Sequence, residues 1–211
     1  MSRIKVVSFD LEGTLVTPDF SQAVWYEGVP SLYAKRYGID FQMAKAIVCK
    51  AYEEVGDKRK EWYDIKYWFS RFQLGDYREV LENQRHKLSY YPDASPVLSS
   101  LVGKYTLIVA TGTAREFLPY LLDGLERYFV RIFSSISDYG QLKSLPFYTK
   151  VCQEIGVRPS EMVHIGDSWH FDFLAAQESG IRVFLLNRSQ ETKNATSLKS
   201  LKELEMRLPP R

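Results

Sequence analysis

Residues 4–15 read IKVVSFDLEGTL, a short apolar run that ends in two acidic residues, a glycine and a threonine. The run is nearly continuous rather than alternating, which is typical of a parallel strand covered by helices on both faces. Asp10 and Glu12 follow it directly. Because ligands of open α/β sheets bind beyond the carboxyl ends of the strands, these two side chains are candidates for a functional site.

Later apolar runs have the same character and cover residues 105–110, 130–136, 162–165 and 181–186. Helical patterns occur at residues 116–128, 146–155, 171–179 and 197–208. From residue 105 onward strands and helices therefore alternate, which is typical of a doubly wound parallel sheet. We predict an α/β fold whose core is a five-stranded parallel sheet.

The long interval between the first two predicted strands has no strand pattern. Amphipathic helices are expected there at residues 21–37, 41–55, 62–72 and 77–89, separated by glycines. A crossover between parallel strands needs only about a dozen residues, so the excess predicts an inserted module of four or five helices. The predicted domains are an α/β core, residues 1–17 and 93–211, and a helical domain, residues 18–92.

Composition and charge exclude several classes of protein. The 211 residues include 28 Lys plus Arg against 26 Asp plus Glu, and this balance predicts neither a nucleic-acid nor a membrane partner. No apolar stretch approaches the roughly 20 residues of a membrane span, and the first apolar run is too short for a signal peptide. Cys49 and Cys152 have no metal-site spacing, which fits a cytoplasmic protein. The oligomeric state is not determined by the sequence.

Further polar residues follow the other predicted strands. Thr111 and Gly112 come after the second, Lys143 after the third, and Asp167 after the fourth, with Asp172 five residues later. If Asp10 and Asp167 converge about 4 Å apart, their repulsion amounts to a few kcal/mol at an effective dielectric near 20 and requires a cation. Mg²⁺ prefers such oxygen ligands, whereas the absence of cysteine and histidine from the set disfavours zinc.

The simplest chemistry for such a site is phosphoryl transfer to a carboxylate. Asp10 is the candidate nucleophile, because an aspartyl phosphate divides one difficult hydrolysis into two easier steps. Glu12 is the candidate general acid and base. Charge on the phosphate oxygens requires donors and a cation, which Thr111, the Gly112 N–H and Lys143 would provide.

With these residues the chain resembles the haloacid dehalogenase (HAD) superfamily, which is dominated by phosphatases. The match comprises DxxGT at 10–14, the strand-end Thr111, Lys143 followed by Pro146, and GDSxxxD at 166–172. The resemblance implies a Rossmann-like core, with the inserted helices acting as a cap over the site. It implies Asp10 as nucleophile, Thr111 and Lys143 as phosphate ligands, and Mg²⁺ bound by Asp10, the Glu12 backbone carbonyl and Asp167. Asp172 would support the metal shell or orient Lys143.

The chain departs from the family pattern in two places. Most of the phosphatases have Asp where this chain has Glu12, which extends the carboxylate by about 1.5 Å. The motif at 10–14 resembles that of the enolase-phosphatase branch, which has Glu at this position. Dehalogenases lack an acidic residue there. The usual acidic residue near the proline after Lys143 is also missing. Lys143 stays the candidate lysine, and Lys150 is a less favoured alternative to it.

We therefore predict a Mg²⁺-dependent phosphatase of a small phosphorylated metabolite. The alternatives are a phosphomutase of the same family and a non-catalytic phosphate-binding regulatory protein. His164 is interpreted as a hydrogen-bonded core residue and His170 as solvated, while Arg115 is a weaker candidate for contact with a substrate anion. Aromatic residues of the insert are expected mainly in its core, with one or two facing the substrate. They are Trp25, Tyr26, Trp62, Tyr63, Tyr67, Trp68 and Phe69.

Overall fold

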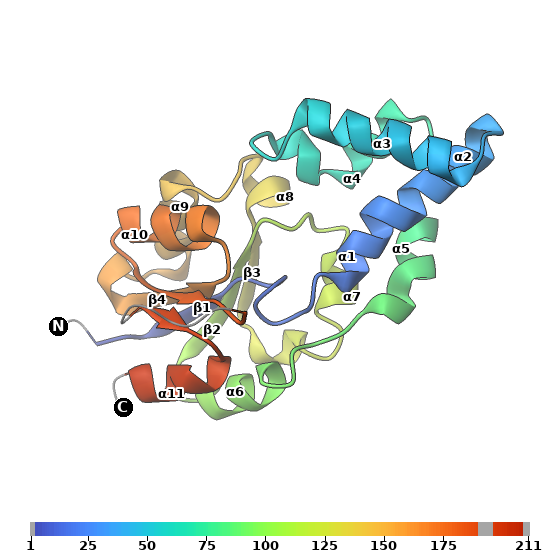
Figure 1. Ribbon diagram of the computed structural model, residues 1–211. Helices are drawn as coiled ribbons and strands as arrows, with labels where there is room; N and C mark the ends of the chain where they lie inside the picture. The colour runs from blue at the N-terminus through green and yellow to red at the C-terminus, as the bar shows by residue number, and fades with distance from the viewer. Residues whose placement is uncertain (1–2, 190–195, 209–211) are drawn as a thin grey trace.

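A parallel sheet forms the centre of the larger part of the molecule (Figure 1). The computed structural model describes residues 3–189 and 196–208, and within them six strands lie in the order β3-β2-β1-β4-β5-β6, all parallel. The strands are β1 (Val6–Phe9), β2 (Thr106–Thr111), β3 (Arg131–Ser134), β4 (Met162–Gly166), β5 (Arg182–Leu186) and β6 (Ser197–Leu198).

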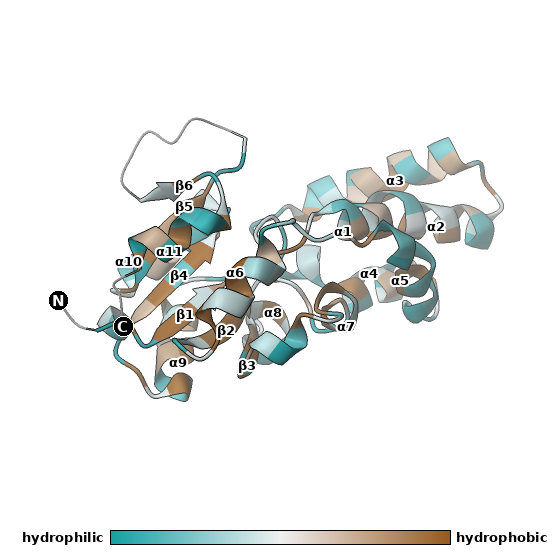
Figure 2. Ribbon diagram, turned by 90° about the horizontal axis from the view of Figure 1, so that it is seen from below, coloured by the Kyte–Doolittle hydropathy of each residue, from teal (hydrophilic) through white to brown (hydrophobic). Residues whose placement is uncertain are grey.

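Helices cover both faces of the sheet, which explains why the strands are mostly apolar. Alternate residues of β1 belong to different cores: Val7 packs with α6 (Ala94–Leu101) and α11 (Leu204–Arg207), whereas Val6 packs with α9 (Leu145–Ile155) and α10 (Ala175–Glu178). In Figure 2 the central strands are correspondingly brown, the hydrophobic end of the scale. The predicted doubly wound α/β architecture is confirmed.

The prediction of five strands misses β6, and the predicted helix over 197–208 is wrong in its first half. Leu185 N–H donates to Thr196 O (2.9 Å) and Asn187 N–H to Leu198 O (2.7 Å), so this segment extends the free edge of β5. Leu198 is fully buried there. Two residues are too short for a strand pattern to show in a sequence. Only η7 (Leu201–Glu203) and α11 are helical.

The helix predicted over 116–128 is also interrupted. It consists of α7 (Leu118–Leu121) and the single turn η4 (Glu126–Tyr128). Between them Gly124 has φ +77°, outside the right-handed helical region. The apolar run 130–136 likewise contains β3 and the first turn of α8 (Ser135–Tyr139), where the Ser134 hydroxyl accepts the Ser137 N–H at 3.1 Å.

Strand order determines where the polar residues gather. The sheet reverses its winding between β1 and β4, which is the position where open α/β sheets bind ligands. Phe9 lies beside Val109 of β2 and Ile165 of β4. The residues that follow these three strands therefore meet at one edge of the sheet.

A group of helices lies on one side of that edge in Figure 1. It consists of α1 (Asp19–Ala23), η1 (Val24–Gly28), α2 (Val29–Tyr37), α3 (Phe41–Val55), η2 (Lys60–Tyr63), α4 (Ile65–Arg71), α5 (Arg78–Gln84) and η3 (Arg85–Lys87). Asp40 and Asp64 begin α3 and α4, since their side chains accept N–H groups of the first turns. The turn η1 is a widened π turn just before Pro30, which has no N–H to continue the α-helical pattern.

The chain passes from the core into the helical group and back through two adjacent segments. Val16 and Tyr90 form an antiparallel bridge, Thr17 N–H donates to Ser89 O (2.9 Å), and Tyr91 N–H donates to Leu15 O (3.0 Å). The domain boundaries at 17/18 and 92/93 stay a prediction. Among the described residues, no helix combines the length and the apolar character that crossing a membrane requires.

Candidate active site

Asp10 lies directly after β1 and is almost completely buried, with 6% of its surface exposed. Its N–H donates to Ile165 O at 2.8 Å, which fixes it against β4. Lys143 Nζ lies 2.9 Å from Asp10 Oδ1. Burial raises the pKa of Asp10, although the Lys143 ammonium opposes this shift. A carboxylate in such surroundings gains from any additional cation.

Lys143 is shared between two carboxylates. Its ammonium contacts Asp172 Oδ1 as well as Asp10, and both side chains are buried. Burial opposes the charge of Lys143, but the two carboxylates raise its pKa above the ordinary value. Burial alone would raise the pKa of Asp172, but Lys143 and His164 hold this pKa below its usual range. Lys143 and Asp172 therefore form a buried ion pair.

A network of buried hydrogen bonds fixes the position of the Asp172 side chain. His164 Nε2 lies 3.1 Å from Asp172 Oδ1 and 3.0 Å from the Tyr148 hydroxyl, and its Nδ1 lies 2.9 Å from Ser8 Oγ. Ser168 N–H donates to Asp172 Oδ2 at 3.0 Å. His164 is thus the hydrogen-bonded core residue that the sequence indicates. Tyr148 has no signal in the sequence, because a tyrosine on the apolar face of α9 resembles an ordinary core residue.

Asp167 completes an acidic cluster. Oxygens of Asp10, Asp167 and Asp172 all lie within 4.8 Å of one another. Partial desolvation and then the charges of Asp10 and Asp172 raise the pKa of Asp167. Both oxygens of Asp172 are occupied, Oδ1 by Lys143 and Oδ2 by the Ser168 N–H, whereas Lys143 contacts only Oδ1 of Asp10. Asp10 and Asp167 therefore retain oxygens for a ligand. This all-oxygen donor set fits Mg²⁺.

Gly13 allows the loop after β1 to approach Asp167. Its φ is +76°, and a Cβ at this position would lie 2.2 Å from Asp167 Oδ2. Any side chain would therefore displace the carboxylate.

We expect Gly13→Ala to weaken Mg²⁺ binding measurably and to destabilise the fold by more than the roughly 1 kcal/mol that a positive φ costs an alanine. Gly38→Ala is the matched control, because Gly38 has φ +65° and no atom within 4 Å of its Cβ position. Titration calorimetry with Mg²⁺ and urea unfolding measure both effects. Equal losses in the two variants would show that the contact with Asp167 has no influence.

Glu12 belongs to the same site through a contact with the second strand end. Thr113 Oγ1 donates to Glu12 Oε2 at 2.8 Å, and Thr113 is in turn bound to Thr111, whose Oγ1 accepts the Thr113 N–H at 3.2 Å. Burial raises the pKa of Glu12, although the nearby hydroxyls of Ser21 and Thr113 oppose this. Thr113 was not among the predicted residues, and only its place two residues after Thr111 could have suggested it.

The predicted site residues other than Asp167 line one cavity of about 180 Å³, and Asp167 adjoins it through its cluster with Asp10 and Asp172. Its polar lining includes Asp10, Glu12, Thr111, Gly112, Thr113, Lys143 and Asp172. Its apolar lining consists of Trp25, Tyr63, Ala114, Phe117, Leu142 and Phe171. The cavity therefore combines acidic and cationic groups with aromatic rings that come from both the core and the inserted helices.

Comparison with known proteins assigns the family. Residues 4–180 match the haloacid dehalogenase-like hydrolases. The chain belongs to this family. It is 28% identical to a phosphoglycolate phosphatase of Vibrio vulnificus over 204 residues, which cover 86% of this chain and 82% of the relative.

Solved structures agree on the fold of this HAD hydrolase. A HAD phosphatase from Thermococcus onnurineus superposes with a TM-score of 0.85 at 27% identity, covering 97% of this chain and 98% of the other. A 2-haloacid dehalogenase from Pseudomonas syringae superposes with a TM-score of 0.69 at 22% identity, covering 96% and 97%. The second likeness concerns the fold alone.

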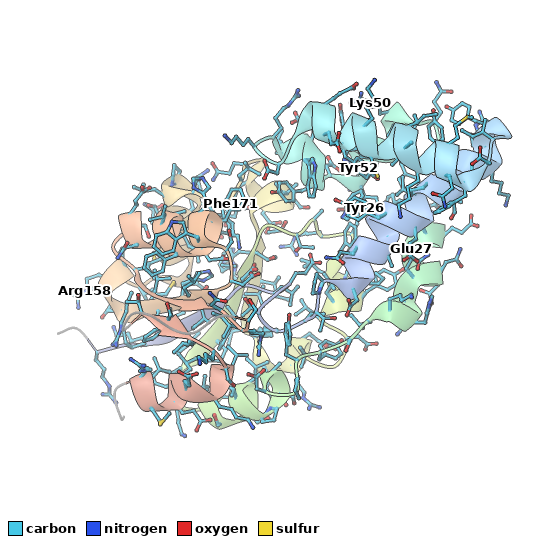
Figure 3. All side chains as sticks on the ribbon, viewed as in Figure 1. Tyr26, Glu27, Lys50, Tyr52, Arg158 and Phe171 are labelled. Atoms are coloured by element: carbon cyan, nitrogen blue, oxygen red, sulfur yellow. The ribbon has the colours of Figure 1, made fainter. Side chains whose placement is uncertain are left out.

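Other candidates lie outside the cavity lining of this hydrolase. Arg115 pairs with Asp138, and its Nη2 donates to Asp138 Oδ2 at 2.9 Å, so it does not face the site. Lys150 lies over the Tyr139 ring, 5.3 Å from its centroid. Of the aromatic residues of the insert, Trp25 and Tyr63 line the cavity. Tyr26 and Tyr52 instead face each other inside the helical group (Figure 3).

Proposed function

We propose that this HAD hydrolase is a Mg²⁺-dependent phosphatase that hydrolyses a small phosphorylated metabolite through an aspartyl phosphate on Asp10. The observation that carries the proposal is the buried Asp10 carboxylate, 2.9 Å from the Lys143 ammonium and clustered with Asp167, with Glu12 in the same cavity. The relatives named phosphoglycolate phosphatase support phosphate-ester chemistry for this chain.

In the first step a carboxylate oxygen of Asp10 attacks phosphorus. The bond between phosphorus and the ester oxygen breaks, and the Glu12 carboxyl group donates its proton to the departing oxygen. In the second step Glu12, now ionised, removes a proton from water as the water oxygen attacks phosphorus. The bond between phosphorus and the Asp10 oxygen breaks, which releases inorganic phosphate and restores the enzyme.

The other polar residues bind the phosphoryl group. The Thr111 hydroxyl, the Gly112 N–H and the Lys143 ammonium line the cavity beside Asp10 and would bind its oxygens. Asp10, the Glu12 carbonyl and Asp167 would hold Mg²⁺, which when bound neutralises charge on the phosphate. Asp172 positions Lys143 through their ion pair.

Residues 18–92 would act as the cap that excludes water. Two aromatic pairs join this segment to the core at the cavity. Trp25 and Phe117 have ring centroids 5.4 Å apart, and Tyr63 and Phe171 have centroids 6.5 Å apart. Such a cover strengthens electrostatic interactions inside the site and limits access of bulk water.

The test is phosphate release from a panel of phosphomonoesters in the presence of Mg²⁺ or of EDTA. We expect release from at least one ester with Mg²⁺, and at least about a hundredfold less with EDTA, since the metal contributes several kcal/mol to transition-state stabilisation. Binding of a phosphate analogue without turnover of any ester would favour the phosphate-binding protein. Isomerisation of a sugar phosphate without net phosphate release would favour the phosphomutase.

A further inference from the structure

Apart from the catalytic residues and several hydroxyl groups, the described lining of the cavity is apolar. Trp25 and Tyr63 come from the helical group, and Phe117, Leu142 and Phe171 come from the core. Phe171 lies on the part of the core that faces the helical group (Figure 3). The leaving group of a substrate bound at Asp10 would contact these rings.

Lys143 is the one cation in the described lining, and it is already shared by Asp10 and Asp172. Cations close to the site in the sequence are occupied: Arg115 pairs with Asp138, and Lys66 of the helical group pairs with Glu116. With the acidic residues Asp10, Glu12 and Asp172 facing the same space, a second anionic group on the substrate would meet like charges.

Among the described residues outside the lining, Lys60 is a candidate for contact with an anionic leaving group. Its Nζ lies 3.6 Å from the place of a Cβ on Gly140, close in sequence to the lining residue Leu142, but Lys60 itself is not part of the lining. Lys60 is exposed to solvent. It is therefore the position to examine if the substrate is anionic at both ends.

Two buried serine hydroxyls of the described lining, those of Ser21 and Ser135, have no hydrogen-bond partner, and the Ser21 hydroxyl lies near Glu12. Ser135 is fully buried, lines the cavity, and its Oγ makes no hydrogen bond. An unpaired buried hydroxyl is costly, and an ester or phosphoryl oxygen of a bound substrate would satisfy it. A cavity of about 150 Å³ admits a benzene ring in another protein, so the 180 Å³ here can take a small ring.

We infer that the substrate is a phosphate monoester of an uncharged, apolar alcohol, most favourably one with an aromatic ring, and not an ester whose alcohol carries a carboxylate. This inference rests on the proposed phosphatase function and specifies its substrate class. It sets the chain apart from what the name of its phosphoglycolate phosphatase relatives would suggest, because that substrate carries a carboxylate beside the ester.

The test compares benzyl phosphate, 2-phosphoglycolate and 4-carboxybenzyl phosphate with the full chain in Mg²⁺. All three are esters of primary alcohols, so differences reflect the cavity more than the leaving oxygen. We expect kcat/KM for benzyl phosphate to exceed that for 2-phosphoglycolate by about 100-fold or more, since a lost apolar contact and an unpaired charge act together. The added carboxylate should also reduce turnover of 4-carboxybenzyl phosphate relative to benzyl phosphate.

Tyr63→Arg reverses the character of the apolar lining. It should lower kcat/KM for benzyl phosphate and raise it for 2-phosphoglycolate, and opposite changes cannot come from general damage to the fold. Tyr37→Arg is the matched control, because Tyr37 and Tyr63 both donate their hydroxyl to a backbone carbonyl of the helical group but Tyr37 does not line the cavity. Lys60→Gln should leave the ratio of the two substrates unchanged.

The outcomes separate the two proposals. Equal or faster turnover of 2-phosphoglycolate than of benzyl phosphate by the unaltered protein overturns the inference and leaves the phosphatase function intact, as does a loss of 2-phosphoglycolate turnover in Lys60→Gln. Phosphate release from 4-nitrophenyl phosphate but from none of the three esters of primary alcohols also overturns the inference. No release from any ester, including 4-nitrophenyl phosphate, overturns the phosphatase function itself.

Discussion

We expect Asp10→Asn to abolish Mg²⁺-dependent phosphate release, with a loss of about 10⁴-fold or more in kcat, because a neutral amide replaces the nucleophilic carboxylate. Asn has the same shape, so the hydrogen bond from the residue 10 N–H to Ile165 O and the strand pairing remain. Phosphate release measured with the best ester of the panel gives the loss. Circular dichroism melting should show that the variant still folds.

A second measurement tests the covalent step directly. Wild-type protein quenched in acid during turnover should carry a phosphoryl group on the peptide that contains Asp10, and the Asn variant should not. Asp123→Asn is the matched control, because Asp123 is an exposed aspartate whose Oδ2 accepts Arg85 Nη2 at 2.9 Å away from the cavity. Turnover by Asp10→Asn at more than a small fraction of the wild-type rate would exclude Asp10 as the nucleophile.

The convergence of Asp10, Thr111 and Asp167 follows from the sequence because each residue ends an apolar run of the type that forms a parallel strand. Once β1 lies between β2 and β4, their carboxyl ends meet without any further information. Lys143 differs, since it follows no strand directly and comes after α8. Its place at the site was predicted from the need for a cation near the phosphate and from the family motif, but its direct contact with Asp10 was not.

Interactions that depend on tertiary packing could not be predicted from the sequence pattern. Tyr148 reaches His164 across the layer between α9 and β4, and nothing in a helical apolar face indicates which hydroxyl finds a polar partner. Thr113 reaches Glu12 from a segment 101 residues away. The two-residue strand β6 depends on the free edge of β5 rather than on its own sequence. These features are tertiary, and local propensity does not encode them.

Lys143→Met should impair both activity and stability, because it removes the common partner of two buried carboxylates. Asp172 is fully buried and Asp10 nearly so. Leaving a buried charge unpaired typically costs about 3 kcal/mol or more, and loss of a group that stabilises transition-state charge costs about 10²–10³-fold in kcat. Urea unfolding and phosphate release measure the two effects. Lys150→Met is the matched control: Lys150 is exposed, and its replacement should change the free energy of unfolding by less than about 0.5 kcal/mol.

Combining Lys143→Met with Asp172→Asn separates the two effects. The amide of Asn removes the stranded negative charge and can still accept the Ser168 N–H, which in the native protein bonds to Asp172 Oδ2 at 3.0 Å. The double variant should therefore regain about 1 kcal/mol or more of the stability lost in Lys143→Met, since contacting residues are coupled by this order of magnitude. Its phosphatase activity should stay as low as that of Lys143→Met, because no ammonium group then faces Asp10 and the phosphate. Recovery of activity together with stability would mean that Lys143 serves the fold and has no part in binding phosphate.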